Sequence, residues 1–314
     1  MRPRSLSVVV PVYRSAGSLP ELVRRLEPVL KEHVGLFEVL LVNDGSPDES
    51  WKTIGDLSAT HPFVRGIDLA RNYGQHNALL CGILEAEGEL VVTMDDDLQH
   101  RPEDIPALLG ALTRDVDVVY GTPERERHGL FRDAASRLTK IVLKGVMGAE
   151  AARLVSPFRL FRTKLREAFS GCRSPWVSID VLLTWGTSRF AAVRVPHEER
   201  RIGTSHYTVR KLMRHALNMM TGYSVLPLRL ASLAAFAFML FGFGVLAFVV
   251  GRYLIVGSPV PGFPMLASIV SILGGVQLFA LGILGEYLAR MHVRLMDSPP
   301  FVVKETTRPR GPIA

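Results

Sequence analysis

Two uncharged apolar runs near the C-terminus constrain the fold of this chain more than any other feature. They extend from Leu230 to Gly251 and from Met265 to Gly285, and each has roughly the 20 residues that a helix needs to cross a bilayer. A short Gly/Pro-rich segment, Val256–Pro264, lies between them. The sequence therefore predicts a transmembrane hairpin, and the alternative is a pair of buried helices in a soluble domain.

The distribution of basic residues predicts the orientation of this hairpin. The connecting turn has only Arg252 at its edge, whereas both outer flanks are basic, with Arg210, Lys211, Arg214, Arg229, Arg290, His292 and Arg294. By the positive-inside rule we expect a multi-pass protein of the inner (plasma) membrane with both termini and the large N-terminal part in the cytoplasm. No signal peptide is expected, because the apolar stretch Leu6–Val12 is too short.

The charge balance points to lipid and phosphate rather than to nucleic acid. The 314 residues carry a formal net charge of +7, which we interpret as attraction to anionic lipid and to phosphorylated substrates. No nucleic-acid partner is predicted. In a cytosolic compartment, Cys81 and Cys172 are expected to be reduced core residues rather than a disulfide.

Before Pro196 the sequence alternates short apolar runs with amphipathic segments. This alternation predicts an α/β fold with a mostly parallel sheet and helices on both faces. The expected strands are Leu6–Tyr13, Phe37–Gly45, Val64–Leu69, Leu90–Met94 and Asp117–Tyr120, and the expected helices lie near Leu19–Glu32, Pro47–Ser58, Gln75–Glu87 and Pro102–Leu112. The tail after Lys304 has the composition of a disordered segment.

The apolar run Leu90–Met94 ends in three consecutive acids, Asp95, Asp96 and Asp97. In open α/β sheets, ligands bind at the C-terminal ends of the strands. Two aspartates one residue apart can share one hard divalent cation, which also binds phosphate oxygens of a substrate. The sequence thus predicts a site for Mg or Mn here, and the alternative is a solvated acidic loop.

A second strand end also carries polar groups. Val42 leads into Asn43 and Asp44, and a carboxylate in this position can accept hydrogen bonds from a nucleobase or a ribose. The same segment is also a good turn and helix N-cap signal. Three strand ends with polar groups, those of the runs ending near Tyr13, Asp44 and Asp95, would meet at one rim of the sheet.

These segments together resemble the family-2 glycosyltransferases of the GT-A fold, specifically the bacterial membrane-anchored polyprenyl-phosphate (or dolichyl-phosphate) sugar synthases. The resemblance covers nearly the whole chain, and the QxxRW signature of processive polysaccharide synthases is absent. The matching segments, in order, are SVVVPVYRS (7–15), VNDGSPDES (42–50), LARNYGQHNALLCGILEAEGE (69–89), VVTMDDDLQHRPEDIP (91–106), FRLFRTKL (158–165), ERRIGTSHYTVRKL (199–212) and LGILGEYLAR (281–290).

The resemblance implies a role for individual residues. A nucleotide-sugar donor would be bound by Pro11, Tyr13, Asp44, Asp95 and Asp96. The metal ligands would be Asp95, Asp97 and Gln99, and the lipid phosphate would be bound by Arg200, Arg201, Ser205 and His206. Asp97 and Arg201 would act in catalysis. The alternative for the two arginines is a solvated cluster of charges next to the membrane.

Two positions depart from the family pattern. His206 stands where the family often has Lys, so a positive charge there would depend on pH. The segment before FRLF usually contains an aspartate that is often proposed as catalytic, but here it reads Ser156 and Pro157. Asp180 could replace this acid, or it could have a helix N-terminal or buried structural role.

The resemblance also implies a domain organisation. Residues 1–205 would form the cytosolic catalytic domain, 206–228 an interfacial amphipathic helix, 229–290 two transmembrane helices with a short outer turn, and 291–314 a cytosolic tail. The segment 207–223 mixes basic and apolar residues at helical spacing, and the alternative is a plain connecting helix. Family members commonly form tetramers, so a homo-oligomer is expected.

The expected activity is inverting transfer of a sugar from a nucleotide sugar to undecaprenyl or another polyprenyl phosphate at the cytoplasmic face. An ionised lipid phosphate needs little help from a general base, because its second pKa is near 6. The alternatives are a non-catalytic membrane scaffold that binds nucleotide sugars and a transferase that uses another lipid or a protein acceptor.

Overall fold

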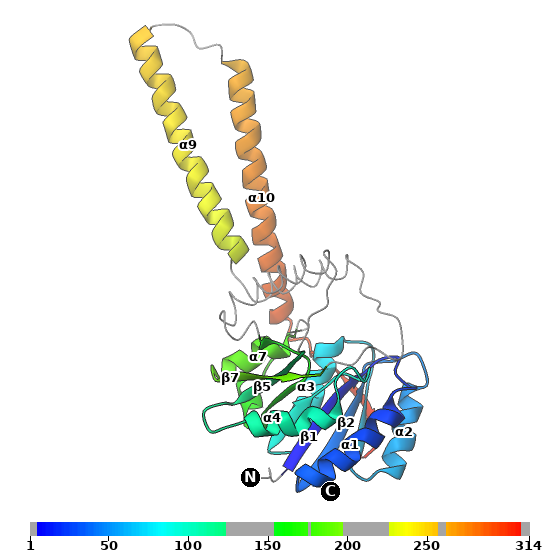
Figure 1. Cartoon of the computed structure of the whole chain (residues 1–314). Helices are drawn as coiled ribbons and strands as arrows, with labels where there is room; N and C mark the ends of the chain where they lie inside the picture. The colour runs from blue at the N-terminus through cyan, green and yellow to red at the C-terminus, as the bar shows by residue number, and fades with distance from the viewer. Residues whose placement is uncertain (1–4, 124–153, 175–176, 197–225, 257–261, 309–314) are drawn as a thin grey trace. The chain divides into compact units, whose positions relative to one another are not determined.

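The computed structural model of the protein describes residues 5–123, 154–174, 177–196, 226–256 and 262–308 (Figure 1). The chain divides into two compact units. One unit comprises Met1–Leu212 together with Asp297–Ala314, and the other comprises Met213–Met296. The first unit contains the sheet and the second contains two long helices.

The first unit is built on a mixed sheet of eight strands in the order β7-β5-β6-β4-β1-β2-β3-β8. The pairs β1–β2, β1–β4, β2–β3 and β5–β7 are parallel, whereas β4–β6, β5–β6 and β3–β8 are antiparallel. The strands are β1 (Ser5–Val12), β2 (Leu36–Asn43), β3 (Val64–Leu69), β4 (Leu90–Thr93), β5 (Val118–Pro123), β6 (Arg159–Arg162), β7 (Phe190–Val195) and β8 (Val303–Thr306). The expected α/β fold with a mostly parallel sheet is confirmed.

Helices cover both faces of this sheet, which explains why the central strands β1, β2 and β4 are buried along nearly their whole length. Side chains of α1, α2 and α4 join one hydrophobic core on one face, and side chains of α3 and α7 join a second core on the other. The helices of this unit are α1 (Leu19–His33), α2 (Ser50–Thr60), α3 (Gln75–Glu85), α4 (Ile105–Ala111) and α7 (Ile179–Gly186), with short 3-10 turns η1 (Pro102–Asp104) and η2 (Thr163–Ala168). Cys81 is free and buried in the second core, and Cys172 is free and half-buried.

The C-terminal tail is ordered further than its composition suggests. We expected disorder after Lys304, but β8 extends to Thr306 and pairs antiparallel with β3. Thr307 continues the contact, because its backbone N–H donates to the Gly66 carbonyl at 3.0 Å. For the described part of the tail the expectation was wrong, because composition describes an isolated segment, whereas an unpaired sheet edge can order a polar strand through backbone hydrogen bonds.

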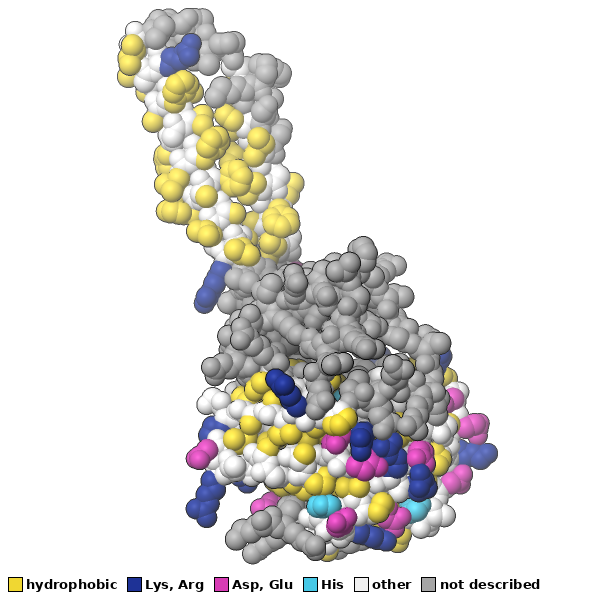
Figure 2. Space-filling view, in the orientation of Figure 1, with side chains coloured by type: hydrophobic (Ala, Val, Ile, Leu, Met, Phe, Trp, Pro, Cys, Tyr) yellow, Lys and Arg dark blue, Asp and Glu magenta, His cyan; other side chains and the backbone are white. Residues whose placement is uncertain are grey.

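The second unit contains the two predicted apolar helices, α9 (Leu226–Val256) and α10 (Phe263–Leu295). Their stretches Leu228–Arg252 and Ile272–Val293 are long and apolar enough to cross a membrane by length and composition, and neither is buried within the protein. Apolar side chains cover the face of these helices seen in Figure 2. The second stretch lies about two turns further along the chain than the uncharged run suggested. It includes Glu286 and Arg290, which form an i,i+4 ion pair at 2.7 Å.

Candidate active site

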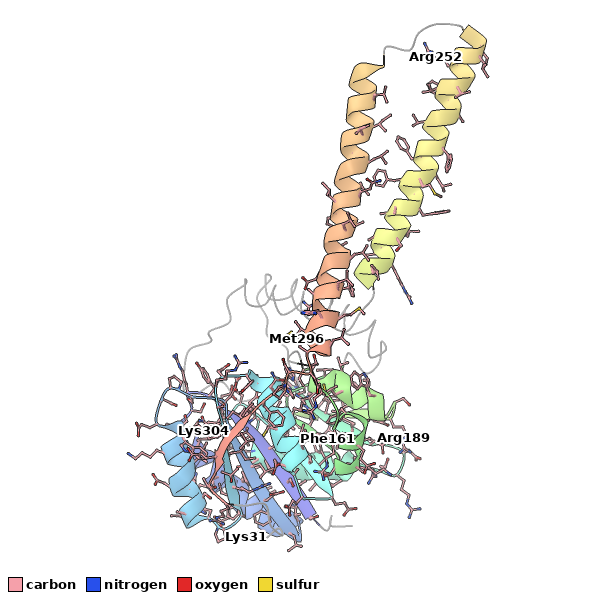
Figure 3. All side chains as sticks on the ribbon, turned by 180° about the vertical axis from the view of Figure 1, so that it is seen from behind. Lys31, Phe161, Arg189, Arg252, Met296 and Lys304 are labelled. Carbon is pink, nitrogen blue, oxygen red and sulfur yellow. The ribbon has the colours of Figure 1, made fainter. Side chains whose placement is uncertain are left out.

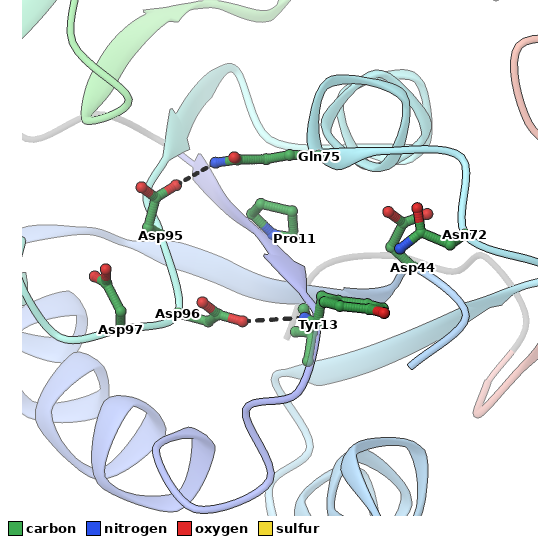
Figure 4. A pocket seen from close by; sticks show the side chains of 9 residues that line it. Pro11, Tyr13, Asp44, Asn72, Gln75, Asp95, Asp96 and Asp97 are labelled. Atoms are coloured by element: carbon green, nitrogen blue, oxygen red, sulfur yellow. Dashed lines mark hydrogen bonds between the residues drawn. The ribbon is translucent and has the colours of Figure 1, made fainter. Parts of the chain in front are cut away.

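A pocket of about 240 Å³ lies where strands β1, β2 and β4 end (Figure 4). Parallel pairing brings these ends together, since Val12 is opposite Asn43 and Val9 is opposite Thr93. The pocket is lined by Pro11, Val12, Tyr13, Asp44, Asn72, Gln75, Asp95, Asp96 and Asp97. All five residues predicted to bind the nucleotide are among them, and so is Asp97.

Asp44 is buried beside a loop that follows β3. Its two carboxylate oxygens accept hydrogen bonds from the backbone N–H groups of Tyr73 (2.7 Å) and Gly74 (2.8 Å). Burial raises the pKa of the Asp44 carboxyl above its ordinary 3.8, and these two hydrogen bonds oppose the rise. The remaining lone pairs can accept hydrogen bonds from a ligand in the pocket.

Gly45 allows this loop to approach. Its φ of +57° is in the left-handed region, and an added Cβ would lie 2.5 Å from the Arg71 carbonyl carbon and from the Asn72 nitrogen. A side chain would therefore clash with the backbone of the loop, as well as strain its own backbone. The residue after Asp44 must be glycine for the loop to donate to the Asp44 carboxylate.

The three acids after β4 are each held by a different contact. The Gln75 side-chain amide donates to Asp95 Oδ1 at 2.7 Å, and the backbone N–H of Tyr13 donates to Asp96 Oδ2 at 3.2 Å (Figure 4). Asp97 Oδ1 accepts the Gln99 backbone N–H at 3.1 Å. Burial raises the pKa of the Asp96 carboxyl, and the Asp97 charge adds to the rise.

The donor set fits a hard divalent cation that is shared with a ligand. Asp95 and Asp97 offer carboxylate oxygens to the same pocket, and within the described residues no group of three or more His, Cys, Asp or Glu side chains could hold a metal. A cation bound here would thus complete its shell with waters and phosphate oxygens, as Mg²⁺ commonly does. Gln99 is not among the pocket-lining residues, and its role as a ligand stays a prediction.

Asp180 does not line this pocket. It is buried, and its Oδ1 accepts hydrogen bonds from Arg159 Nη1 at 2.7 Å and from the Tyr120 hydroxyl at 3.1 Å. Burial, and secondly the Asp180 charge, raise the pKa of Tyr120 well above 10. These contacts match the structural role considered for Asp180 more closely than the role of a replacement for the missing catalytic acid.

The segment Ser156–Pro157, where the family usually has an acid, is held against the sheet by hydrogen bonds. The Pro157 carbonyl accepts hydrogen bonds from Thr93 Oγ1 at 2.9 Å and from Arg159 Nε at 3.4 Å. Ser156 is buried, and its Oγ accepts the Phe158 backbone N–H at 3.3 Å. Asp180 therefore holds the arginine that contacts this segment.

Three pocket residues, Val12, Asn72 and Gln75, had no assigned role in the sequence. Asn72 and Gln75 come from the loop after β3 and from the first turn of α3. The signal was present, because both lie in the family-like segment 69–89, directly after a predicted strand. The four residues predicted to bind the lipid phosphate, Arg200, Arg201, Ser205 and His206, lie outside the described residues, as does the interfacial segment 207–223.

The fold and this pocket define a transferase of the GT-A type. Residues 7–169 match the family model described as glycosyl transferase family 2, and the chain belongs to that family. It is a glycosyltransferase.

Relatives match over nearly the whole chain. The undecaprenyl-phosphate 4-deoxy-4-formamido-L-arabinose transferase of Pseudomonas paraeruginosa is 34% identical over 96% of this chain and 90% of the relative. The enzyme of the same name from Yersinia pestis is 32% identical, over 96% of this chain and 93% of the relative. These matches include the two apolar helices as well as the first unit, Met1–Leu212 with Asp297–Ala314, which is called the catalytic unit below.

Solved structures confirm the fold. Glucosyl-3-phosphoglycerate synthase from Mycobacterium tuberculosis, in complex with Mn²⁺, UDP-glucose and phosphoglyceric acid, superposes with a TM-score of 0.53 at 18% identity, covering 69% of this chain and 78% of that one. Mannosyl-3-phosphoglycerate synthase from Rubrobacter xylanophilus gives 0.51 at 18% identity, covering 72% and 74%. At this identity the likeness concerns the fold alone.

Proposed function

We propose that this protein transfers a sugar from a nucleotide-sugar donor to undecaprenyl phosphate, or a closely related polyprenyl phosphate, at the cytoplasmic face of the membrane. The relatives that match over at least nine-tenths of both chains are named as undecaprenyl-phosphate transferases. The two long apolar helices suit an acceptor that stays in the bilayer. The sugar in the names of the relatives, 4-deoxy-4-formamido-L-arabinose, is the first donor sugar to test.

The observation that carries this proposal is the convergence of Tyr13, Asp44 and the acids after β4 on one pocket. Asp44 offers a buried carboxylate for the ribose or the base, and the exposed Tyr13 ring offers a flat surface for stacking. Asp95 and Asp97 face the same space, where the diphosphate would lie. This arrangement supports a nucleotide site along the C-terminal ends of the parallel strands.

A divalent cation, Mg²⁺ or Mn²⁺, would be held by Asp95 and Asp97. The cation would neutralise the negative charge that develops on the leaving nucleoside diphosphate. The Gln75 amide, bound to Asp95 at 2.7 Å, holds that carboxylate in place before the ligand arrives. The Mn²⁺ in the Mycobacterium tuberculosis synthase structure supports a cation in this fold.

The acceptor phosphate is proposed to act as its own nucleophile. With a second pKa near 6, it is largely ionised at pH 7, so no carboxylate is required as a base. The absence of an acid at Ser156 and Pro157, and the engagement of Asp180 by Arg159, are consistent with this route. Direct displacement at the anomeric carbon inverts its configuration. Arg200 and Arg201 are proposed to bind the phosphate, since a guanidinium matches phosphate oxygens bidentately.

The return of the chain to the sheet supports the hairpin topology. Strand β4 precedes the two apolar helices, and β8 follows them, yet both belong to one sheet. A chain that leaves and re-enters the same sheet must cross the membrane an even number of times. Two crossings with both flanks in the cytoplasm meet this condition and also obey the positive-inside rule.

The direct test is a transfer assay with purified protein, undecaprenyl phosphate and a panel of nucleotide sugars. The panel includes a nucleotide-linked 4-deoxy-4-formamido-L-arabinose. We expect a lipid-linked sugar phosphate of inverted anomeric configuration. Undecaprenol, which lacks the phosphate, is the control acceptor and should give no product. Equal transfer to undecaprenol, or to diacylglycerol, would contradict the assignment of the acceptor.

A further inference from the structure

We propose that β8, the strand that follows the two apolar helices, is a positioning element of the donor pocket, and that Lys304 is its positioning residue. The inference rests on the proposed binding of a nucleotide in the pocket at Asp44. Lys304 lies on β8, seen from behind in Figure 3. It does not line the pocket, so its effect would pass through β3 and the loop that follows β3.

The backbone of β8 holds the end of β3 from which the pocket loop begins. The register pairs Asp68 with Glu305 and Leu69 with Val303. The Ala70 backbone N–H then donates to the Val302 carbonyl at 2.9 Å. Ala70 is the first residue of the loop that carries Asn72, Tyr73 and Gly74, and Val302 directly precedes β8. The β8 segment therefore holds the start of this loop.

Side chains reinforce this edge at the other end of β8. Thr307 Oγ1 accepts the Gly66 backbone N–H at 2.9 Å and lies 2.8 Å from Ser58 Oγ. An added Cβ on Gly66 would come within 2.9 Å of Thr307 Cγ2, so the two strands are in close contact. The Arg308 guanidinium donates to the Pro62 carbonyl at 2.7 Å and also to the Ser58 carbonyl.

A chain of polar contacts connects Lys304 with Asn43, the residue that directly precedes Asp44. Lys304 Nζ lies 2.9 Å from Asp68 Oδ2, and the other oxygen of this buried carboxylate accepts the Asn43 amide at 2.6 Å. Asn43 is the last residue of β2 and directly precedes Asp44. Lys304 thus supplies the cation for the buried Asp68 carboxylate, which in turn binds the residue next to Asp44.

Both routes end at Asp44. The loop that follows β3 donates two backbone hydrogen bonds to the Asp44 carboxylate. The Lys304–Asp68–Asn43 contacts hold the residue that precedes Asp44. A nucleotide that binds Asp44 should therefore stabilise the pairing of β8, and loss of Lys304 should weaken nucleotide binding. Such a coupling is reciprocal by thermodynamic necessity.

The first experiment measures UDP and GDP binding, each with Mn²⁺, to the full-length protein by calorimetry. Lys304→Met removes the cation, Lys304→Arg keeps it, and Lys31→Met removes a different exposed lysine that pairs with Glu27 on α1. We expect Lys304→Met to raise the nucleotide Kd roughly fivefold or more, Lys304→Arg to restore most of the affinity, and Lys31→Met to change nothing. The acceptor KM and the kcat at saturating donor should stay near wild type in all three variants.

The second experiment measures the reverse effect, that of nucleotide binding on β8, by amide hydrogen exchange. The two edge strands of the sheet, β7 and β8, provide an internal comparison. We expect the nucleotide with Mn²⁺ to slow amide exchange in residues 302–307 and to leave Phe190–Val195 unchanged. In Lys304→Met this protection should diminish.

The outcomes separate this inference from the proposed function. If neither nucleotide binds the wild type, the proposed donor pocket is wrong and this inference is overturned with it. If a nucleotide binds but Lys304→Met only lowers the thermal midpoint or kcat, with an unchanged Kd, Lys304 is merely structural and only this inference is overturned. Equal protection of β7 and β8 would also contradict it.

Discussion

The guanidinium of Arg159 and the carboxylate of Asp180 form a buried ion pair, with Nη1 2.7 Å from Oδ1. Arg159 is 2% exposed and Asp180 is 6% exposed. Removal of one partner from a buried pair typically destabilises a protein by about 3–5 kcal/mol, because the other charge remains uncompensated. This relationship decides how a mutation of Asp180 should be interpreted.

We predict that Asp180→Asn lowers stability more than it lowers the rate of transfer. Its stability loss should approach the figure for a broken buried pair, whereas turnover per folded molecule should fall less than tenfold. Loss of a general base would cost about 10²–10⁴-fold. Thermal unfolding and the transfer rate, normalised to the folded fraction, separate the two. A folded Asp180→Asn protein with a rate reduced a thousandfold would make Asp180 the catalytic base.

Asp95→Asn and Asp97→Asn should each abolish detectable transfer while the protein remains folded. Each change removes a negative oxygen donor from a site that offers few others, and the metal would then be held too weakly. EDTA should inactivate the wild type, and Mg²⁺ or Mn²⁺ should restore it. Asp115→Asn, at an exposed aspartate elsewhere in the catalytic unit, is the matched control. Full activity in EDTA would refute the metal assignment.

Nucleotide affinity should fall as the solution is acidified, and Asp44 should be responsible. Burial raises the Asp44 pKa above 3.8 in the free protein, and hydrogen bonds from a bound nucleotide favour the ionised form and lower it again. Binding therefore releases protons, so the affinity falls as the pH falls through the raised pKa. Calorimetric titrations with UDP and Mn²⁺ between pH 7 and pH 4 would show this slope.

The same titration has a matched variant. Asp44→Asn should bind more weakly at pH 7 and should lose the part of the slope that Asp44 contributes, because the amide does not titrate. For stability the sign is opposite. A raised pKa in the folded state means that this carboxyl contributes less stability as the pH rises above 3.8. An identical pH slope in Asp44→Asn and wild type would assign the titration to another group.

The topology can be tested by cysteine labelling in intact cells. In a background with Cys81 and Cys172 replaced by Ser, we expect Ser258→Cys to react with a membrane-impermeant maleimide from the outside. A cysteine added after Ala314 should react only after the cells are permeabilised. The expectation follows from the basic flanks and from the return of β8 to the sheet. Labelling of the C-terminal cysteine from outside would exclude a hairpin with both flanks in the cytoplasm.

Local patterns in the sequence were sufficient to place most elements of the catalytic unit. The strand Val64–Leu69 has the predicted bounds, and the helix predicted at Leu19–Glu32 ends one residue later, at His33. These elements are set by short-range apolar periodicity and by breakers such as glycine and proline. The parallel order of β1, β2 and β4 then follows from strand–helix alternation, which is why the acids after β4 and Asp44 were expected at one rim.

Contacts between distant residues were not accessible in this way. Gln75 and Asp95, or Lys304 and Asp68, become neighbours only when the strands pair. The environment of Asp180 is a further case, because an acid at the start of a helix has the same local sequence whether it faces a ligand or a buried arginine.

The sequence by itself determined the class of enzyme, the two apolar helices and the acids at the strand ends, because motif order, apolar run length and strand periodicity are local properties. Only the tertiary structure decided that Asp180 pairs with Arg159, that Gln75 holds Asp95 and that the tail after the helices becomes β8. These outcomes depend on which surfaces remain unpaired after the sheet has formed, and on the cost of leaving a buried charge or a strand edge without a partner.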